Sequence, residues 1–205
     1  MRVFIYIGIL FFIIISLLGC SVKEAHKATR FHQSTSISNT DNESASLPNM
    51  QTLDMNKARL AINAFREVGV EKIIQNFNPV MLKDITVKTG LNGAFLSRCD
   101  IDVIKAIIAS GWAPSVILQT PGGQKHIRVV IGYNDPPRRL TLVDFKDPAR
   151  FIQLDEGYDD FERQWDRNTC VIIDRNVSEA SIKPSLSRYL SSEKIMSVGI
   201  TTRVN

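Results

Sequence analysis

The spacing of the apolar residues changes near Trp112, and this change limits the folds that the chain can adopt. Before it, apolar side chains recur every three or four residues, as they do in amphipathic helices. After it come short runs rich in β-branched residues and bounded by Pro, Gly or charged residues, which predict strands. Helices followed by a group of strands are typical of an α+β domain with an antiparallel sheet, and this is the fold class we expect.

Three helices are predicted in the first half of the chain. Asp54 is a candidate N-cap for a helix that stops at Gly69, a shorter helix is expected over 79–88, and a third begins after Cys99 and ends at Gly111. Strands are expected at 115–120, 126–134, 139–144 and 170–174, with a short helix at 158–165.

The first twenty residues form an apolar run that does not belong to the folded core. Its sixteen apolar or small residues from Val3 to Leu18 are marginal for crossing roughly 30 Å of hydrocarbon. The run ends in "LLGC", which resembles the lipobox of bacterial lipoproteins, whose cysteine is lipidated and becomes the mature N-terminus. The resemblance implies a signal peptide over 1–20 and a lipid on Cys20, with a simple membrane anchor as the alternative. The protein would then lie in the bacterial cell envelope, on the periplasmic side of the outer membrane in a Gram-negative host.

The segment that follows Cys20 differs in composition from the rest of the chain. Residues 21–50 are rich in Ser, Thr and Asn and nearly lack large apolar side chains, so they cannot bury enough surface to offset the entropy of ordering. We expect a flexible tether there, followed by a domain over 51–175. Residues 176–205 are polar and weakly periodic, which predicts a C-terminal tail or one surface helix.

Charge and motifs exclude several classes of function. The formal charge of +4 falls to +3 when the segment holding Arg2 is removed, and the basic residues are interleaved with acidic ones, so no nucleic-acid partner is expected. His26 and His32 have no acidic or cysteine cluster nearby, which argues against a metal site. Gly122-Gly123 lacks the spacing of a phosphate-binding loop. We therefore expect no metal and no cofactor.

The second half of the chain carries a more specific pattern. "HIRVVIGYN" starts at His126 and runs into Gly-Tyr, Asp147-Pro148 follows, and a helix then carries Phe161 and Trp165. This order resembles that of peptidase C39-like domains, the bacteriocin-processing branch of the papain-like cysteine peptidases. The resemblance implies a papain-like fold in which N-terminal helices precede an antiparallel sheet.

The same resemblance implies roles for four positions. In the family, a cysteine thiolate at a helix start attacks the peptide, a histidine takes its proton, an acid orients the histidine and a glutamine stabilises the oxyanion. His126 matches the base and Asp147 the orienting acid, with Asp144 as the alternate acid. Gln51 matches the oxyanion glutamine.

The nucleophile position departs from the family pattern. Met55-Asn56-Lys57 stands where Cys-Gly-Pro belongs, and a thioether cannot form an acyl-enzyme. Cys99 is a possible alternative nucleophile because it comes directly before a predicted helix, whose N-terminus lowers a thiol pKa. Burial of Cys99, or a disulfide with Cys170, is the competing interpretation.

We therefore expect a membrane-anchored lipoprotein whose C39-like domain has lost its nucleophile and binds a peptide or protein partner. One alternative is an active cysteine peptidase that uses Cys99 or a nucleophile elsewhere in the chain. Another is a structural envelope lipoprotein without a ligand site. An open groove lined by Tyr133 and the tryptophans would favour binding, and a dry, filled cleft around His126 would favour the structural role.

Overall fold

The structure is a computed structural model that describes residues 45–145 and 150–205. The predicted signal peptide, Cys20 and most of the predicted tether lie outside the described residues, as does Asp147. Of the helices in the part that is described, none is long and apolar enough to cross a membrane.

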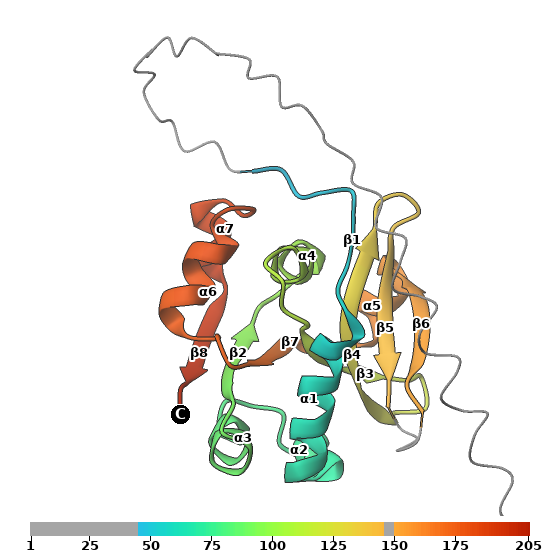
Figure 1. The fold of residues 1–205 in the computed structure, drawn as a ribbon. Coiled ribbons are helices and arrows are strands. Elements are labelled where there is room, and N and C mark those ends of the chain that lie inside the picture. The colour runs from blue at the N-terminus through green and yellow to red at the C-terminus, as the bar shows by residue number, and fades with distance from the viewer. Residues whose placement is uncertain (1–44, 146–149) are drawn as a thin grey trace, which may run out of the picture. The chain divides into compact units, whose positions relative to one another are not determined.

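An antiparallel sheet runs through the domain (Figure 1). Its eight strands within the described ranges follow the order β6 (Ile152–Gly157), β5 (Arg139–Asp144), β4 (Lys125–Asn134), β3 (Ser115–Gln119), β7 (Trp165–Asp174), β2 (Asn92–Ser97) and β8 (Gly199–Arg203), with β1 (Met50–Thr52) paired to β4. All of these pairings are antiparallel, so the predicted α+β class with an antiparallel sheet is confirmed.

Helices cover both faces of this sheet, so that two hydrophobic cores form. One core holds α1 (Met55–Val68), α2 (Val70–Gln75) and α3 (Met81–Thr89), which lie below the sheet in Figure 1. The other holds α4 (Ile101–Ala109), α5 (Tyr158–Gln164) and α6 (Glu179–Leu186), and α7 (Ser192–Ser197) follows α6. Successive residues of a strand alternate between the cores: Val171 packs on the α1 side and Ile172 on the α4 side.

The helix starts predicted at Asp54 and after Cys99 are confirmed by their caps, whereas the helix predicted over 79–88 is α3, which begins at Met81 without a side-chain cap. The Asp54 carboxylate accepts a hydrogen bond from the Asn56 amide at 2.8 Å, and α1 ends at Gly69, whose φ of 106° favours glycine. The Asp100 carboxylate accepts a hydrogen bond from the Val103 amide at 3.1 Å at the start of α4. The predicted strands are also present, although β7 begins at Trp165, before the predicted residue 170.

The predicted domain boundary at residue 175 is wrong. Ile182 and Leu186 of α6 are fully buried against the α4 side of the sheet, and β8 pairs with β2 from Gly93↔Arg203 to Ser97↔Gly199. Residues 176–205 are therefore part of the domain, not a tail or a lone surface helix. The sheet also includes one residue before the predicted domain start at 51, since Met50 pairs with Asn134.

Candidate functional site

The residues that match the oxyanion and nucleophile positions lie beside the C-terminal part of β4. Gln51 pairs with Tyr133, and the Leu53 amide donates to the Ile131 carbonyl at 2.7 Å. The cap at Asp54 follows, so Met55 is the first residue of α1, as the alignment with the family predicts.

His126 lies near the opposite end of β4, where it pairs with Leu118 of β3. Gly132, which pairs with Thr52, is six residues further along the strand, or roughly 20 Å at ~3.3 Å per residue. His126 instead shares a pocket with Arg66 in the last turn of α1, about 16 Å of helix from Met55 at ~1.5 Å per residue. The structure therefore does not bring Gln51 and Met55 to His126, and the catalytic set implied by the resemblance is not assembled within the described residues.

The pocket beside His126 has a volume of about 290 Å³. Apolar side chains of α2 and Phe145 form part of its wall. Its charged and titratable residues are Arg66, Glu71, Lys125, His126, Arg128 and Asp144. Asp144, the alternate orienting acid, thus lies in the same pocket as His126, and its role toward that imidazole stays a prediction.

Two of the cations in this pocket are held by carboxylates. Arg128 Nη2 lies 3.0 Å from Asp144 Oδ2, and both side chains are largely buried. Burial lowers the pKa of Arg128, and the charges of Asp144 and Glu156 only partly offset this effect. Lys125 Nζ lies 2.8 Å from Asp166 Oδ2. An incoming anion would have to compete with these carboxylates for either cation.

Arg66 differs from these two cations because part of its guanidinium lacks an acceptor among the described residues. Its Cζ lies 5.5 Å from the centre of the Phe151 ring, which Arg59 approaches at 5.6 Å. Its Nη2 is buried and has no hydrogen-bond partner in the described part of the chain. An unmade hydrogen bond of this kind costs about 1–3 kcal/mol, so a carboxylate placed here would be stabilised.

The two described cysteines are buried side by side as free thiols. Cys99 is 2% exposed and Cys170 is 0% exposed, and their Sγ atoms lie 3.9 Å apart. The hydrogen bond with Cys99, together with burial, raises the pKa of the Cys170 thiol well above its usual value. A buried thiol is a poor nucleophile, and the competing interpretation of Cys99, burial, is confirmed.

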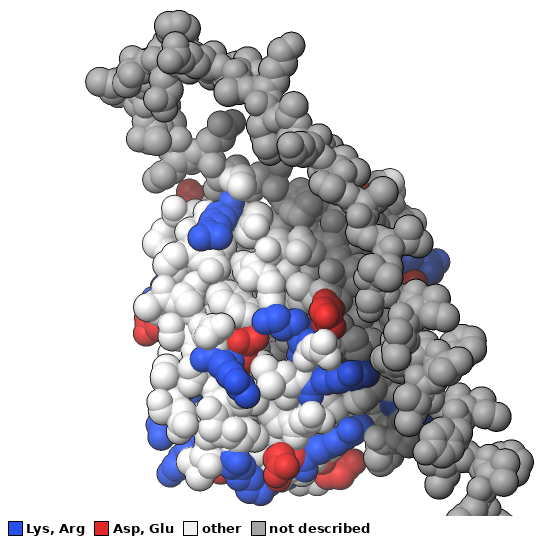
Figure 2. Space-filling model, viewed as in Figure 1, with Lys and Arg blue, Asp and Glu red and all other residues white. Residues whose placement is uncertain are grey.

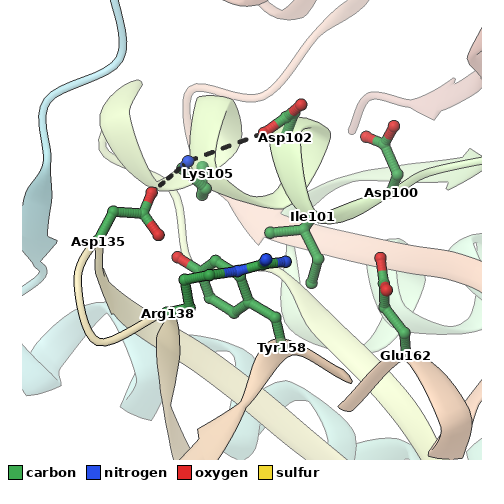
Figure 3. Close-up of a pocket in the computed structure, with 8 residues that line it drawn as sticks. All are labelled: Asp100, Ile101, Asp102, Lys105, Asp135, Arg138, Tyr158 and Glu162. Carbon is green, nitrogen blue, oxygen red and sulfur yellow. Dashed lines mark ion pairs between the residues drawn. The ribbon is translucent and has the colours of Figure 1, made fainter. Parts of the chain in front are cut away.

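A larger pocket, of about 510 Å³, was not identified from the sequence (Figure 3). It lies between the N-terminal end of α4, the turn that joins β4 to β5, and α5. Its residues are Asp100, Ile101, Asp102, Lys105, Asp135, Arg138, Tyr158 and Glu162. They come from three segments distant in sequence, and no local spacing signals that these segments meet.

Lys105 and Asp135 form the ionic centre of this larger pocket. The Lys105 ammonium contacts the Asp135 carboxylate and lies 3.7 Å from Asp102 Oδ1 and 5.4 Å from the centre of the Tyr133 ring. Burial raises the pKa of Asp135, but its interactions with Lys105, Tyr158 and Arg138 outweigh this effect and hold the pKa below its ordinary value. Asp135 is therefore ionised at neutral pH.

The groove lined by Tyr133 and the tryptophans, which would have favoured binding, is not formed by the described residues. Tyr133, Trp112 and Trp165 are all buried in the core on the α4 side. Burial, with the charge of Asp135, raises the pKa of Tyr133 to about 12. The described residues also contain no cluster of His, Cys, Asp and Glu that could hold a metal ion.

Comparisons with protein-family models, with curated proteins and with solved structures find nothing that matches this chain.

Proposed function

We propose that this protein is a membrane-anchored binding protein whose domain holds an acidic group of a peptide or protein partner and does not cut it. One observation carries the proposal: Arg66 lines an open pocket while its buried Nη2 lacks an acceptor among the described residues. A carboxylate from a partner supplies that acceptor and pairs with a guanidinium in a bidentate manner.

Arg66 is the cation of the pocket that a partner can engage at least cost. Arg128 and Lys125 each have a carboxylate within 3.0 Å, and displacing either one would break an ion pair. Val70, Ile74 and Phe145 provide apolar surface beside Arg66 for the carbon atoms of the same ligand.

Charge on the surface supports an acidic partner. Figure 2 shows that Lys and Arg side chains are more frequent than Asp and Glu over the lower half of the visible face, where Figure 1 draws α1 and α3. A positive surface speeds the approach of a negatively charged partner, with an effect that weakens as salt is added.

The placement of the residues that match the catalytic positions of the peptidase family supports binding without hydrolysis. Met55 and Gln51 lie well away from His126, and Cys99 and Cys170 are buried. The papain-like relationship and the lipid on Cys20 are parts of the same proposal. Loss of radiolabelled palmitate incorporation in the Cys20→Ser variant would test the anchor.

The binding proposal is tested with full-length protein in detergent and a fluorescent heptapeptide that contains Glu and Leu. We expect Arg66→Gln to weaken binding by about tenfold or more, because a charged hydrogen bond contributes about 1.5–3 kcal/mol. Arg59→Gln is the matched control, since Arg59 contacts the same Phe151 ring from outside the pocket.

Two outcomes would contradict the proposal. Equal affinity of the wild type and of Arg66→Gln for the peptide would show that Arg66 does not bind it. Cleavage of the peptide, detected by mass spectrometry and abolished in His126→Ala, would support the peptidase alternative instead.

A further inference from the structure

We propose that the pocket of Figure 3 is a second binding site, which takes an amino group together with a nearby hydrogen-bond acceptor. Free amino acids and the N-terminal residues of peptides share this chemistry. The inference is independent of the pocket beside His126, because it rests on other residues near the other end of β4.

The charges of the pocket favour a ligand with a positive group. Four carboxylates and two cations line it, which gives a formal charge of −2. Lys105 is shared between Asp135 and Asp102, and Lys194 contacts Asp100. Glu162 is exposed and has no ion pair among the residues that the structure describes. A ligand ammonium beside Glu162 and Asp100 would reduce this excess of negative charge.

Donors and acceptors are separated within the pocket. In Figure 3, Glu162 points from α5 toward the N-terminal end of α4, which Asp100 precedes, at one end of the pocket. Lys105 and the Tyr158 hydroxyl meet Asp135 at the other end, and the Arg138 guanidinium lies between the two ends. A dipolar ligand matches this arrangement when its ammonium faces the acids and its oxygen faces the donors.

Tyr158 places a hydroxyl at the donor end of the pocket. The residue is only 4% exposed, and its buried hydroxyl makes no hydrogen bond of regular geometry within the described ranges. Burial and the neighbouring Asp135 raise the pKa of Tyr158 well above its usual value, so the hydroxyl keeps its proton. Because the contact of this hydroxyl with Asp135 lacks regular hydrogen-bond geometry, a ligand acceptor that enters as the side chains adjust can accept its hydrogen bond instead.

Arg138 is available to help bind the oxygen of the ligand. Its Cζ lies 5.5 Å from the centre of the Tyr158 ring. Its ion pair is long and exposed, with 3.7 Å between Arg138 Nη2 and Asp159 Oδ1, and such pairs contribute little. The guanidinium can therefore turn toward a ligand carbonyl or carboxylate at low cost.

The size of the pocket fits a small dipolar ligand. Its volume of about 510 Å³ is within the range of small-molecule sites. Ile101 and the Tyr158 ring offer apolar surface to a side chain of the ligand.

Calorimetric titration of the full-length protein in detergent tests the site with four probes that share one side chain. L-leucinamide carries an ammonium and a carbonyl, L-leucine an ammonium and a carboxylate, N-acetyl-L-leucinamide no ammonium, and isopentylamine no acceptor. We expect binding of L-leucinamide or L-leucine and at least about tenfold weaker binding of the other two, equivalent to ~1.4 kcal/mol. Preference for L-leucinamide identifies a peptide N-terminus as the ligand, and preference for L-leucine identifies a free amino acid.

Variants link this binding to the pocket. Glu162→Gln should weaken it by about tenfold, because it removes a charged hydrogen-bond acceptor for the ammonium, and Tyr158→Phe should weaken it as well. Glu193→Gln, on α7 and outside the pocket, is the control. Thermal unfolding of each variant verifies that it is folded. The proposal is overturned if none of the probes binds, if N-acetyl-L-leucinamide or isopentylamine binds as tightly as the dipolar probes, or if folded Glu162→Gln binds like the wild type.

Discussion

At the scale of single residues, Asp135 stands out because it partners Lys105, whose side chain is largely buried. The Lys105 side chain is only 12% exposed, and its other carboxylate, Asp102, is 3.7 Å away from the ammonium. We expect Asp135→Asn to lower the free energy of unfolding at pH 7 by about 1–3 kcal/mol, because it leaves Lys105 poorly satisfied. Urea unfolding followed by circular dichroism measures this. Asp159→Asn, at an exposed neighbouring acid, should change little, and an equal loss in both variants would contradict the expectation.

The Asp135 carboxylate should also make the free energy of unfolding depend on pH. The pKa of Asp135 lies below its ordinary value of 3.8 in the folded protein, so the unfolded chain takes up the proton first as the pH falls. The stabilisation is fully present above the ordinary pKa and is lost as the pH falls from about 4 through the folded-state pKa. Urea titrations at pH 7 and pH 3 should therefore show a smaller difference between the wild type and Asp135→Asn at pH 3. If the difference were the same at both pH values, the ionised form of Asp135 would not be the source of the stabilisation.

At the scale of secondary-structure elements, the thiol pair links the start of α4 to β7. Since both side chains are buried and the pKa of the Cys170 thiol is raised, we expect slow alkylation of both cysteines at pH 8 in the folded protein. His126→Ala should not alter the rates, because neither Cys99 nor Cys170 lines the pocket beside His126. Peptide mass spectrometry after timed iodoacetamide exposure measures both rates. Rapid alkylation of Cys99 that disappears in His126→Ala would instead indicate an activated pair.

How well the sequence predicted each element depended on how much apolar surface the element buries. α1 and α4 have stripes of apolar residues and side-chain caps, and β4 and β5 have β-branched runs, so local patterns identified them. By contrast, β6 was missed because its residues from Ile152 to Asp155 are all exposed and its sequence, "IQLDEG", is acidic. It forms because it pairs with β5 along its whole length, which is a tertiary effect.

The candidate sites were less predictable because they too depend on tertiary contacts, which local sequence patterns do not reveal. The resemblance placed Met55 at a helix start and His126 on a strand, and both placements are confirmed. Their separation follows from the register of β1 on β4, which pairs Thr52 with Gly132, and nothing in the local sequence sets that register. The pocket of Figure 3 likewise depends on Lys105, Asp135 and Tyr158 coming together through folding.

At the scale of the whole molecule, the residues after 175 complete the core on the α4 side. Five of their side chains are buried, namely Val177, Ile182, Leu186, Leu190 and Val198. Fully burying one aliphatic side chain contributes about 1.5–3 kcal/mol, so removing the five costs roughly 7–15 kcal/mol, which equals the whole stability of a typical domain. Removal of β8 also leaves the outer edge of β2 unpaired.

We therefore expect a chain that ends at Arg175 to lose cooperative unfolding, whereas one that ends at Arg203 should keep it. The longer chain retains all of β8 and the five buried side chains, and it loses only the contacts of two exposed residues, such as the hydrogen bond of 2.9 Å from the Asn205 amide to Asn92. Scanning calorimetry with near-ultraviolet circular dichroism distinguishes the two chains. If the shorter chain unfolded in a sharp transition close to the wild-type temperature, α6, α7 and β8 would be an addition to a domain that folds without them. If the chain that ends at Arg175 showed no cooperative unfolding transition, the C-terminal residues would be required for the sheet that carries both pockets.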